Sequence, residues 1–328
     1  MLSQNVSTGQ QPMAIAVNEL THKAYVVNHN SDSVTVLDGK SRSVIATIKT
    51  GRAPEGLAIN PVTNLIYIAN SVDSSVSVID GATDTVTATV RTGNYCQAIA
   101  VNSVTNKIYV ANNYGHSVTV IDGATNSTVT VRVGQGPRAI VANPVTNKIY
   151  TVNYGSKDAS EIDGATNTVT SIPTGKHPWV IAADTRANRI YVVNEDSASV
   201  SIIDGATRET KHVTVGEIPF AVAVNPTTGR AYALSYAGNT MAVIDGAVIK
   251  TVLLNTHPSA IAVNPTINQI YIANQSTASV LIVDGKTNAI TATLKAGTIP
   301  YAMAIDTAAN QVYVVNFSGA DATVIYPK

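Results

Sequence analysis

Short apolar runs separated by polar breaks recur along the whole chain. The stretch KIYVANNYGHSVTVIDG, residues 107–123, contains an apolar run, a polar break, a second apolar run and an Asp-Gly pair. QAIAVN precedes it and STVTVRV follows it, which adds two more runs to the same unit. Alternation and enrichment in β-branched residues favour strands over helices. Each unit is therefore predicted to form four short β-strands.

One tyrosine in every unit opens a strand such as YVVN or YIAN, and these tyrosines recur in steps of 39 to 42 residues. They are Tyr25, Tyr67, Tyr109, Tyr150, Tyr191, Tyr232, Tyr271 and Tyr313. A period of about 40 residues with four β runs is typical of a propeller blade. The residue three positions before each tyrosine is Asn, Gly or His. Because these types best tolerate a positive φ, a left-handed residue is expected there.

The strand count predicts how the fold is completed. Eight copies of the first three strands are present, but only seven of the fourth. The last unit stops at ATVIYPK, whereas NVSTGQQP near the N-terminus aligns with TVRTGNYC from residue 89. We therefore expect the N-terminal strand to complete the last blade and leave no open sheet edge. The predicted fold is all-β: one eight-bladed β-propeller domain of four-stranded antiparallel blades, residues 1–328.

Composition narrows the function. Lys+Arg and Asp+Glu balance at 21 each, and charged residues make up only 13%. A nucleic-acid partner is not expected without a basic stripe, and membrane insertion is not expected without a window of about 18 apolar residues. The N-terminus lacks the basic and apolar regions of a signal peptide. The single cysteine, Cys96, excludes an intrachain disulfide, and no C-x-x-C-H motif for covalent haem occurs.

The Tyr-Val-x-Asn strands, segments such as NPVTNKIY and the VIDGAT turns resemble those of YVTN-repeat β-propellers along essentially the whole chain. That family includes surface-layer modules and binding proteins, and related propellers include streptogramin lyases and haem d1 domains. The resemblance implies a propeller fold and favours an extracellular, cell-surface or periplasmic location. It leaves the function open, because fold similarity does not choose among these activities.

Comparison among the repeats separates a constant face from a variable face. Segments such as NPVTNK and DGATNT, which join strands one to two and three to four, barely change. The variable face carries the loop that enters each first strand and the loop between the second and third strands. The residue after the repeated proline differs in every unit: Met13, Glu55, Gln97, Arg138, Trp179, Phe220, Ser259 and Tyr301. Because first strands line the channel of a propeller, these residues are predicted to ring its mouth.

Aromatic residues other than the repeat tyrosines gather on the variable face, apart from Tyr326. They are Tyr95, Tyr114, Tyr154, Trp179, Phe220, Tyr236, Tyr301 and Phe317. Aromatic side chains gathered on one face mark binding surfaces and stack on flat or sugar-like ligands. The first functional hypothesis is a monomeric recognition protein that takes a small molecule, glycan or peptide in an aromatic-lined pocket. Stacking is assigned to Trp179, Phe220 and Tyr301, and orientation of the ligand to Glu55, Gln97 and Arg138. Met13, Ser259, Tyr154, Tyr236 and Phe317 complete the predicted pocket.

Two histidines raise an enzymatic alternative. His177 and His257 stand at equivalent positions, each before a proline. They are either a metal site or acid/base pair, or two loop histidines that never meet. The second hypothesis is therefore a lyase or hydrolase in the same funnel, with His177 or His257 as general base and Glu55 as a further acid. No cofactor is evident, although a divalent metal would fit this hypothesis; the third hypothesis is a purely structural surface module.

Two further residues break the repeat pattern. Glu161 stands where the other third strands have Val or Ile, and a lone carboxylate there is costly unless it is paired or neutral. We expect a bulge that rotates Glu161 outward, with Lys157 able to reach it; a buried functional acid is the alternative. Cys96 is interpreted as a substitution of the repeated proline, with a reactive thiol at the channel mouth as the alternative.

Overall fold

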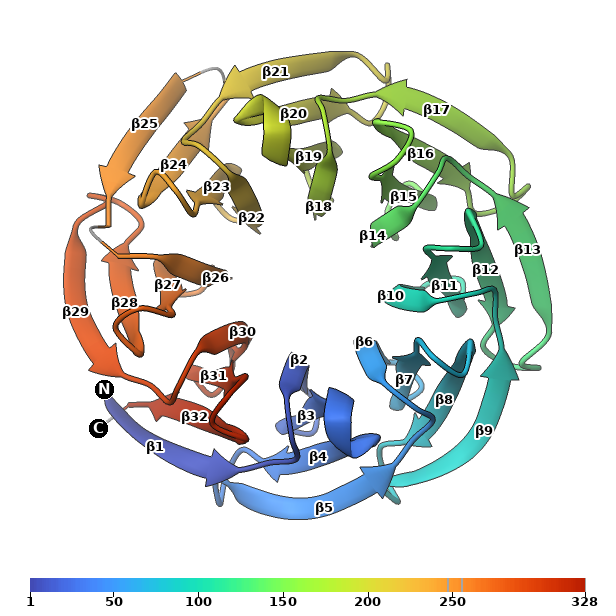
Figure 1. The fold of residues 1–328 in the computed structure, drawn as a ribbon, viewed down its shortest axis with the longest axis horizontal. Coiled ribbons are helices and arrows are strands. Elements are labelled where there is room, and N and C mark those ends of the chain that lie inside the picture. Colours follow the sequence, from blue (N-terminus) through green and yellow to red (C-terminus); the bar gives the residue numbers. More distant parts are fainter. Residues whose placement is uncertain (247, 255, 328) are drawn as a thin grey trace. The chain divides into compact units, whose positions relative to one another are not determined.

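The structure is a computed structural model that describes residues 1–246, 248–254 and 256–327. In this part of the chain the strands form eight four-stranded antiparallel sheets, so the protein is an eight-bladed β-propeller (Figure 1). The chain divides into two compact units, residues 1–73, 77–89 and 254–328 in the first and residues 74–76 and 90–253 in the second. The expectation of a single domain stays a prediction.

The second unit contains four successive blades. In each blade the strands pair in chain order, and the first strands of neighbouring blades contact one another. The bounds are β10 (Cys96–Asn102), β11 (Lys107–Asn112), β12 (Ser117–Asp122), β13 (Thr128–Arg132), β14 (Pro137–Asn143), β15 (Lys148–Asn153), β16 (Asp158–Asp163), β17 (Val169–Pro173), β18 (Pro178–Asp184), β19 (Arg189–Asn194), η2 (Glu195–Ser197), β20 (Ser199–Asp204), β21 (Thr210–Thr214), β22 (Pro219–Asn225), β23 (Arg230–Ser235), β24 (Thr240–Asp245) and β25 (Val248–Leu253).

The first unit combines both ends of the chain. Its elements are β1 (Leu2–Ser7), β2 (Pro12–Asn18), β3 (Lys23–Asn28), η1 (His29–Ser31), β4 (Ser33–Asp38), β5 (Ser43–Lys49), β6 (Pro54–Asn60), β7 (Leu65–Asn70), β8 (Ser75–Asp80), β9 (Thr85–Arg91), β26 (Pro258–Asn264), β27 (Gln269–Asn274), β28 (Ser279–Asp284), β29 (Ile290–Lys295), β30 (Pro300–Asp306), β31 (Gln311–Asn316) and β32 (Asp321–Tyr326). The division between the units passes through β8 and β9.

The N-terminal strand completes the last blade, as predicted. β1 pairs antiparallel with β32, from Leu2 opposite Tyr326 to Ser7 opposite Asp321. The sheet order is β1-β32-β31-β30, so β1 takes the position of a fourth strand. The backbone groups of β32 that would otherwise form an open edge are therefore paired.

The core lies between neighbouring blades within each unit. Second and third strands are buried on both faces, whereas fourth strands such as β13 expose every side chain except one. The eight repeat tyrosines are all at most 1% exposed. One cluster in the second unit packs Tyr150, Val152 and Ile172 against Ile181 and Ile190 of the following blade. Full burial of each such aliphatic side chain contributes about 1.5–3 kcal/mol, which makes blade-to-blade packing the main source of stability.

The turns of the constant face have the backbone that the sequence predicts. All eight residues three positions before the repeat tyrosines have a positive φ, from 51° at Asn106 to 72° at Gly229. At the other turn of the blade, Asp122 accepts hydrogen bonds from the backbone amides of Ala124 and Thr125 at 3.0 and 2.9 Å. The glycine after this aspartate is needed for close approach, because a Cβ on Gly123 would lie 2.5 Å from Asn106 Oδ1.

Candidate functional site

A β-bulge stands at the start of every first strand. In β10, for example, Cys96 is opposite Asn112 and Ala98 is opposite Ala111, so Gln97 has no residue opposite it. The same register shift occurs after the first residue of β2, β6, β14, β18, β22, β26 and β30. The unpaired residues are Met13, Glu55, Gln97, Arg138, Trp179, Phe220, Ser259 and Tyr301. Bulges redirect side chains and are frequent next to functional sites. The variable residue of each repeat is therefore the residue whose side chain the bulge redirects.

A buried asparagine holds the loop that enters the bulge of the fifth blade. In the fifth blade Asn194 is fully buried; its Nδ2 donates to Ser199 Oγ and Ser201 Oγ at 3.2 and 2.8 Å. Its Oδ1 accepts from the backbone amide of Gly175 at 3.1 Å. A Cβ on Gly175 would lie 2.6 Å from Asn194 Cγ, so this approach requires glycine. The loop that carries His177 to Trp179 is thereby fixed to the core.

In the second unit three bulge residues contact one another. The Arg138 guanidinium lies over the Trp179 ring, with Cζ 3.2 Å from the ring centroid. Gln97 Nε2 donates to the backbone oxygen of Arg138 at 3.1 Å. All three side chains are half-buried. The cation–π contact holds one face of the indole and keeps a positive charge beside it.

A second set of side chains extends this contact. Tyr154 stacks on the His177 imidazole with the centroids 4.5 Å apart, and meets Trp179 edge-on at 5.9 Å. Nδ1 of His177 contacts the Asp196 carboxylate of η2. We call Gln97, Arg138, Trp179, Tyr154 and His177 the aromatic ladder. It offers ring faces, a guanidinium and an imidazole in one place, which suits a ligand with both a flat and a polar part.

An acidic depression adjoins the aromatic ladder. It has a volume of about 410 Å³ and is lined by Lys176, Glu195, Asp196, Ala198, Glu217 and Ile218. Asp196 links the two features, since it lines the depression and contacts His177. In the next blade Phe220 meets Tyr236 edge-on, with centroids 6.3 Å apart. This part of the variable face therefore carries both aromatic and carboxylate side chains.

The first unit contains the remaining predicted residues in smaller groups. Glu55 Oε1 lies 3.9 Å from Nε2 of His29, and Tyr301 is tilted against Phe317 at 5.5 Å. The Ser259 hydroxyl donates to the backbone oxygen of Pro300 at 2.5 Å. Met13 is half-buried at the bulge of β2. That the eight bulge residues of the two units ring one channel mouth stays a prediction.

The two histidines at equivalent positions lie in different units. His177 contacts Asp196 and stacks on Tyr154, whereas His257 is exposed and its backbone amide donates to Ser276 Oγ at 3.4 Å. Among the described residues no group of three or more His, Cys, Asp and Glu side chains has a metal-binding arrangement. The assignments of His257 and Glu55 to catalysis, and of a divalent metal, stay predictions.

The expectation for Glu161 is wrong. The register of β16 runs through Glu161 without a shift, with Tyr150 and Thr170 opposite it, so no bulge rotates it outward. Its side chain is only 2% exposed. Glu161 Oε1 accepts from Arg208 at 2.9 Å and lies 3.5 Å from Lys148 Nζ. Lys157, which was expected to reach it, is not its partner.

Glu161, Lys148 and Arg208 form a cluster of charged side chains between the fourth and fifth blades. The hydrogen bond to Glu161 raises the pKa of Arg208, and that of Lys148 is raised mainly by its bond to Asp163. Both cations are partly exposed, whereas the carboxylate is not, so solvent reaches one side of the cluster only. Sequence reasoning missed Arg208 because it lies one blade further along the chain.

Cys96 matches the simpler of its two interpretations. It stands at the first position of β10, where the other first strands have proline. Its side chain is fully buried, and Sγ donates to the backbone oxygen of Ser75 at 3.4 Å. Buried structural cysteines of this kind are inert, so a reactive thiol has no support in this environment.

Comparison with known proteins places this geometry in a family. A family model described as YNCE-like beta-propeller matches residues 53–243, which is more than half of the chain. The chain belongs to the YNCE-like β-propeller family. This agrees with the resemblance to YVTN-repeat propellers. No curated protein matches the chain.

Solved structures share the fold of this YNCE-like propeller at low sequence identity. A hydrazine synthase of Kuenenia stuttgartiensis is 18% identical, with a TM-score of 0.68 over 97% of this chain and 96% of that one. The dihydro-heme d1 dehydrogenase NirN, in complex with DHE, is 16% identical with a TM-score of 0.76 over 94% and 73%. The Cps50 (Swd1) propeller domain of Myceliophteria thermophila is 11% identical with a TM-score of 0.68 over 87% and 99%. At these identities the similarity extends to the fold alone. In the described residues no helix has the length and hydrophobicity needed to cross a membrane.

Proposed function

We propose that the variable face of this propeller is a recognition surface that binds a small molecule, a glycan or a peptide. The observation that carries the proposal is the repeated bulge. The blades are otherwise nearly identical in sequence. Each blade nevertheless presents a different side chain at the one bulge position that has no residue opposite it in the neighbouring strand. Drift of an exposed loop would favour small polar residues, whereas six of these eight positions hold Trp, Phe, Tyr, Met, Arg and Glu.

The aromatic ladder supports a ligand with a stacking part and an anionic or hydrogen-bonding part. Arg138 provides a planar charge at one end, and His177 provides a ring nitrogen at the other. The neighbouring depression adds carboxylates that accept hydrogen bonds from hydroxyl or ammonium groups. The solved structure of NirN in complex with DHE is consistent with ligand binding by a propeller of this fold.

The test is binding to glycan and peptide arrays, followed by calorimetry on each ligand found. Trp179→Ala and Arg138→Gln are expected to weaken binding at least about tenfold, the size of one lost charge-assisted or stacking contact. Thr168→Ala, an exposed side chain on the constant face, is the matched control and should leave the affinity unchanged. The proposal would be refuted if the affinity fell as much in Thr168→Ala as in Trp179→Ala and Arg138→Gln, or if it fell in none of these variants.

One observation favours a second candidate, a lyase or hydrolase with His177 as general base. The contact between His177 Nδ1 and Asp196 gives the imidazole a carboxylate that fixes its orientation, as general bases require. Turnover of ester, lactone or glycoside substrates is expected to disappear in His177→Ala, and kcat is expected to fall in Asp196→Asn, because the imidazole then loses the carboxylate that orients it. Equal activity of His177→Ala and the wild type would eliminate this candidate.

A further inference from the structure

The turn between the third and fourth strands of the second blade lies against the repeat tyrosine of the first blade. In the first unit Asp84, in such a turn, accepts a hydrogen bond from Lys23 Nζ at 2.8 Å and from the Tyr25 hydroxyl at 3.5 Å. Lys23 also donates to the backbone oxygen of Gly81 at 2.9 Å. The turn therefore supplies oxygen acceptors to a cation that stands two residues before the tyrosine.

The second unit repeats this arrangement. Lys107 stands two residues before Tyr109 and donates to the backbone oxygen of Gly164, in the turn of the following blade, at 2.8 Å. One blade further on, Arg208 reaches from its turn to Glu161 over the previous blade. In these blades a turn therefore contacts the strand that contains the repeat tyrosine of the preceding blade, or the strand next to it.

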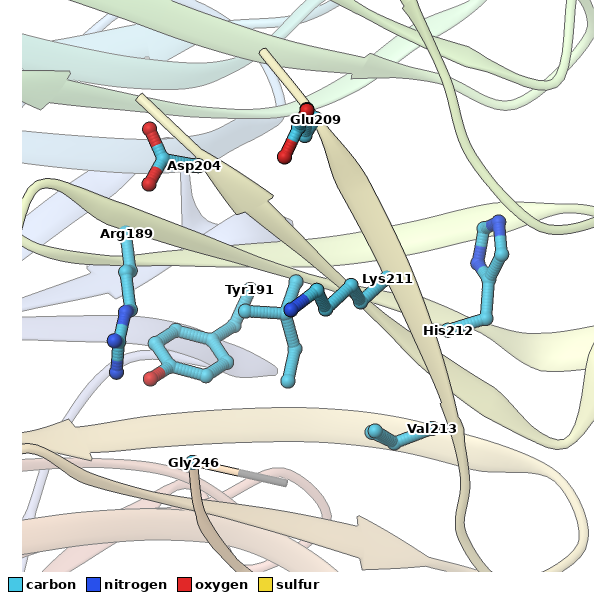
Figure 2. A pocket seen from close by; sticks show the side chains of 9 residues that line it. Arg189, Tyr191, Asp204, Glu209, Lys211, His212, Val213 and Gly246 are labelled. Atoms are coloured by element: carbon cyan, nitrogen blue, oxygen red, sulfur yellow. The ribbon is translucent and has the colours of Figure 1, made fainter. Parts of the chain in front are cut away.

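The sixth blade has a shortened turn. β24 ends at Asp245 and β25 begins at Val248, which leaves two residues of sequence between these strands, whereas 123–127, 164–168 and 205–209 form the connection in the other blades of this unit. In front of Tyr191, where a longer turn would lie, the structure has a cavity of about 670 Å³ (Figure 2). We call it the Tyr191 crevice. It is lined by Arg189, Ile202, Lys211, His212, Val213 and Gly246, among others.

The shortened turn leaves a cation without its acceptor. Arg189 stands at the position of Lys23 and Lys107, but it is exposed where those lysines are half-buried. It contacts the hydroxyl of Tyr191, and in Figure 2 its guanidinium lies beside that ring. Lys211 of β21 adds a second exposed cation. In the described part of the chain, neither Arg189 nor Lys211 is in a salt bridge.

Two acidic side chains near the crevice, Asp245 and Asp204, accept hydrogen bonds from groups other than Arg189 and Lys211. Asp245 accepts from Arg230 Nε at 2.9 Å, within its own blade. Asp204 accepts from the backbone amide of Thr207 at 3.0 Å, which caps its own turn. Glu209 is exposed, and Figure 2 shows it beyond the row formed by Arg189, Tyr191 and Lys211. His212 shares a hydrogen bond with Ser201. The described lining therefore holds two cations, Arg189 and Lys211, and two carboxylates, Asp204 and Glu209, and neither cation forms a salt bridge with them.

We propose that the Tyr191 crevice binds an acidic turn of a partner protein, in the place that a turn of this chain takes over the other tyrosines. A carboxylate and a backbone carbonyl of the partner would bind Arg189 and Lys211, as Asp84 and Gly81 bind Lys23. Tyr191, Ile202 and Val213 supply the apolar wall against which the turn packs. This site is separate from the variable face, because it lies beside the turns of the constant face.

The probe is a fluorescently labelled peptide with the sequence of residues 79–86, IDGATDTV, which contains Asp84. Fluorescence anisotropy on the full chain should show saturable binding that weakens as salt is added. Arg189→Ala and Lys211→Ala should each weaken it at least about fivefold, as should the peptide with Asn in place of Asp84. The matched control is Lys250→Ala, because this exposed lysine has on β25 the register position that Lys211 has on β21.

A second variant tests the geometry of the crevice. Insertion of Thr-Asn-Ser after residue 247 gives the connection the length of residues 123–127, so that the chain would cover Tyr191 itself. This variant should lose peptide binding while its circular dichroism stays that of the wild type. The proposal is overturned by the absence of peptide binding in the wild type, by equal weakening in Lys250→Ala, or by unchanged binding in the insertion variant. The proposal would also be overturned if acetate displaced the labelled peptide completely and bound as tightly as the peptide does, because the crevice would then bind a small carboxylate.

Discussion

The asparagine beneath the bulge of the fifth blade offers a direct test of how the core holds the variable face. Asn194 is fully buried and joins three segments: the amide of Gly175 donates to its Oδ1, and its Nδ2 donates to Ser199 and Ser201. Asn194→Ala removes these three hydrogen bonds and the longer one from Nδ2 to the Ser199 backbone oxygen at 3.4 Å. It frees the loop that carries His177 and Trp179 without altering either side chain.

The expected cost follows from these contacts. Each hydrogen bond contributes about 1 kcal/mol net, so the free energy of unfolding should fall by about 3 kcal/mol. The sixth blade offers a natural comparison, because Ser235 stands at the equivalent position and its buried hydroxyl has no partner among the described residues. Ser235→Ala should therefore change the free energy of unfolding by less than about 0.5 kcal/mol, since no hydrogen bond is lost.

The assay is equilibrium urea unfolding of the wild type and the two variants, followed by circular dichroism. Emission from Trp179, the single tryptophan of the chain, reports on the loop in the same samples. We expect a red shift of native Trp179 emission in Asn194→Ala and none in Ser235→Ala. A loss below about 1 kcal/mol in Asn194→Ala, or an equal loss in both variants, would refute the reasoning that the asparagine fixes the loop.

Three further predictions concern the rest of the chain. Glu161→Val should leave urea stability unchanged or raise it, because its partners Lys148 and Arg208 are partly exposed and can be solvated; a loss above about 1 kcal/mol would contradict this. The backbone amide of Thr207 is the main group that holds the pKa of Asp204 below its usual range. The ionised Asp204 carboxylate should contribute its full stabilisation above about pH 5, and this contribution should decline as the pH falls through about 3.9 toward the folded-state pKa. The free energy of unfolding of Asp204→Asn, measured by urea titration at a series of pH values, should therefore depend less on pH than that of the wild type. Buried Cys96 should react with a thiol reagent only as fast as the protein unfolds, and rapid labelling of the native protein would show that burial is incomplete.

The propeller fold could be predicted because each repeat contains the local sequence signals of its strands and turns. The alternation of apolar residues sets the strands, and the Asn, Gly or His before each tyrosine marks the left-handed turn that the structure has. Even the pairing of β1 with β32, which joins the two ends of the chain, followed from the likeness of NVSTGQQP to an internal repeat. Repetition supplies the comparison that long-range pairing otherwise needs.

The details of the site were less accessible, because they depend on contacts between blades. Lys157, close to Glu161 in sequence, was the expected partner, whereas Arg208 of the next blade is the actual one. His177 was chosen for its place before a proline, but its contact with Asp196 joins two loops of one blade and has no local pattern. The bulge, too, is a matter of register, which alternation alone does not define.

The most direct measurement of the central claim is a titration of Trp179 emission with the ligands that the arrays identify. The account predicts a saturable change in emission at the concentration range of binding, lost in Arg138→Gln and kept in Thr168→Ala. Binding by calorimetry with no change in Trp179 emission, or the same titration in both variants, would contradict the claim that the aromatic ladder contacts the ligand.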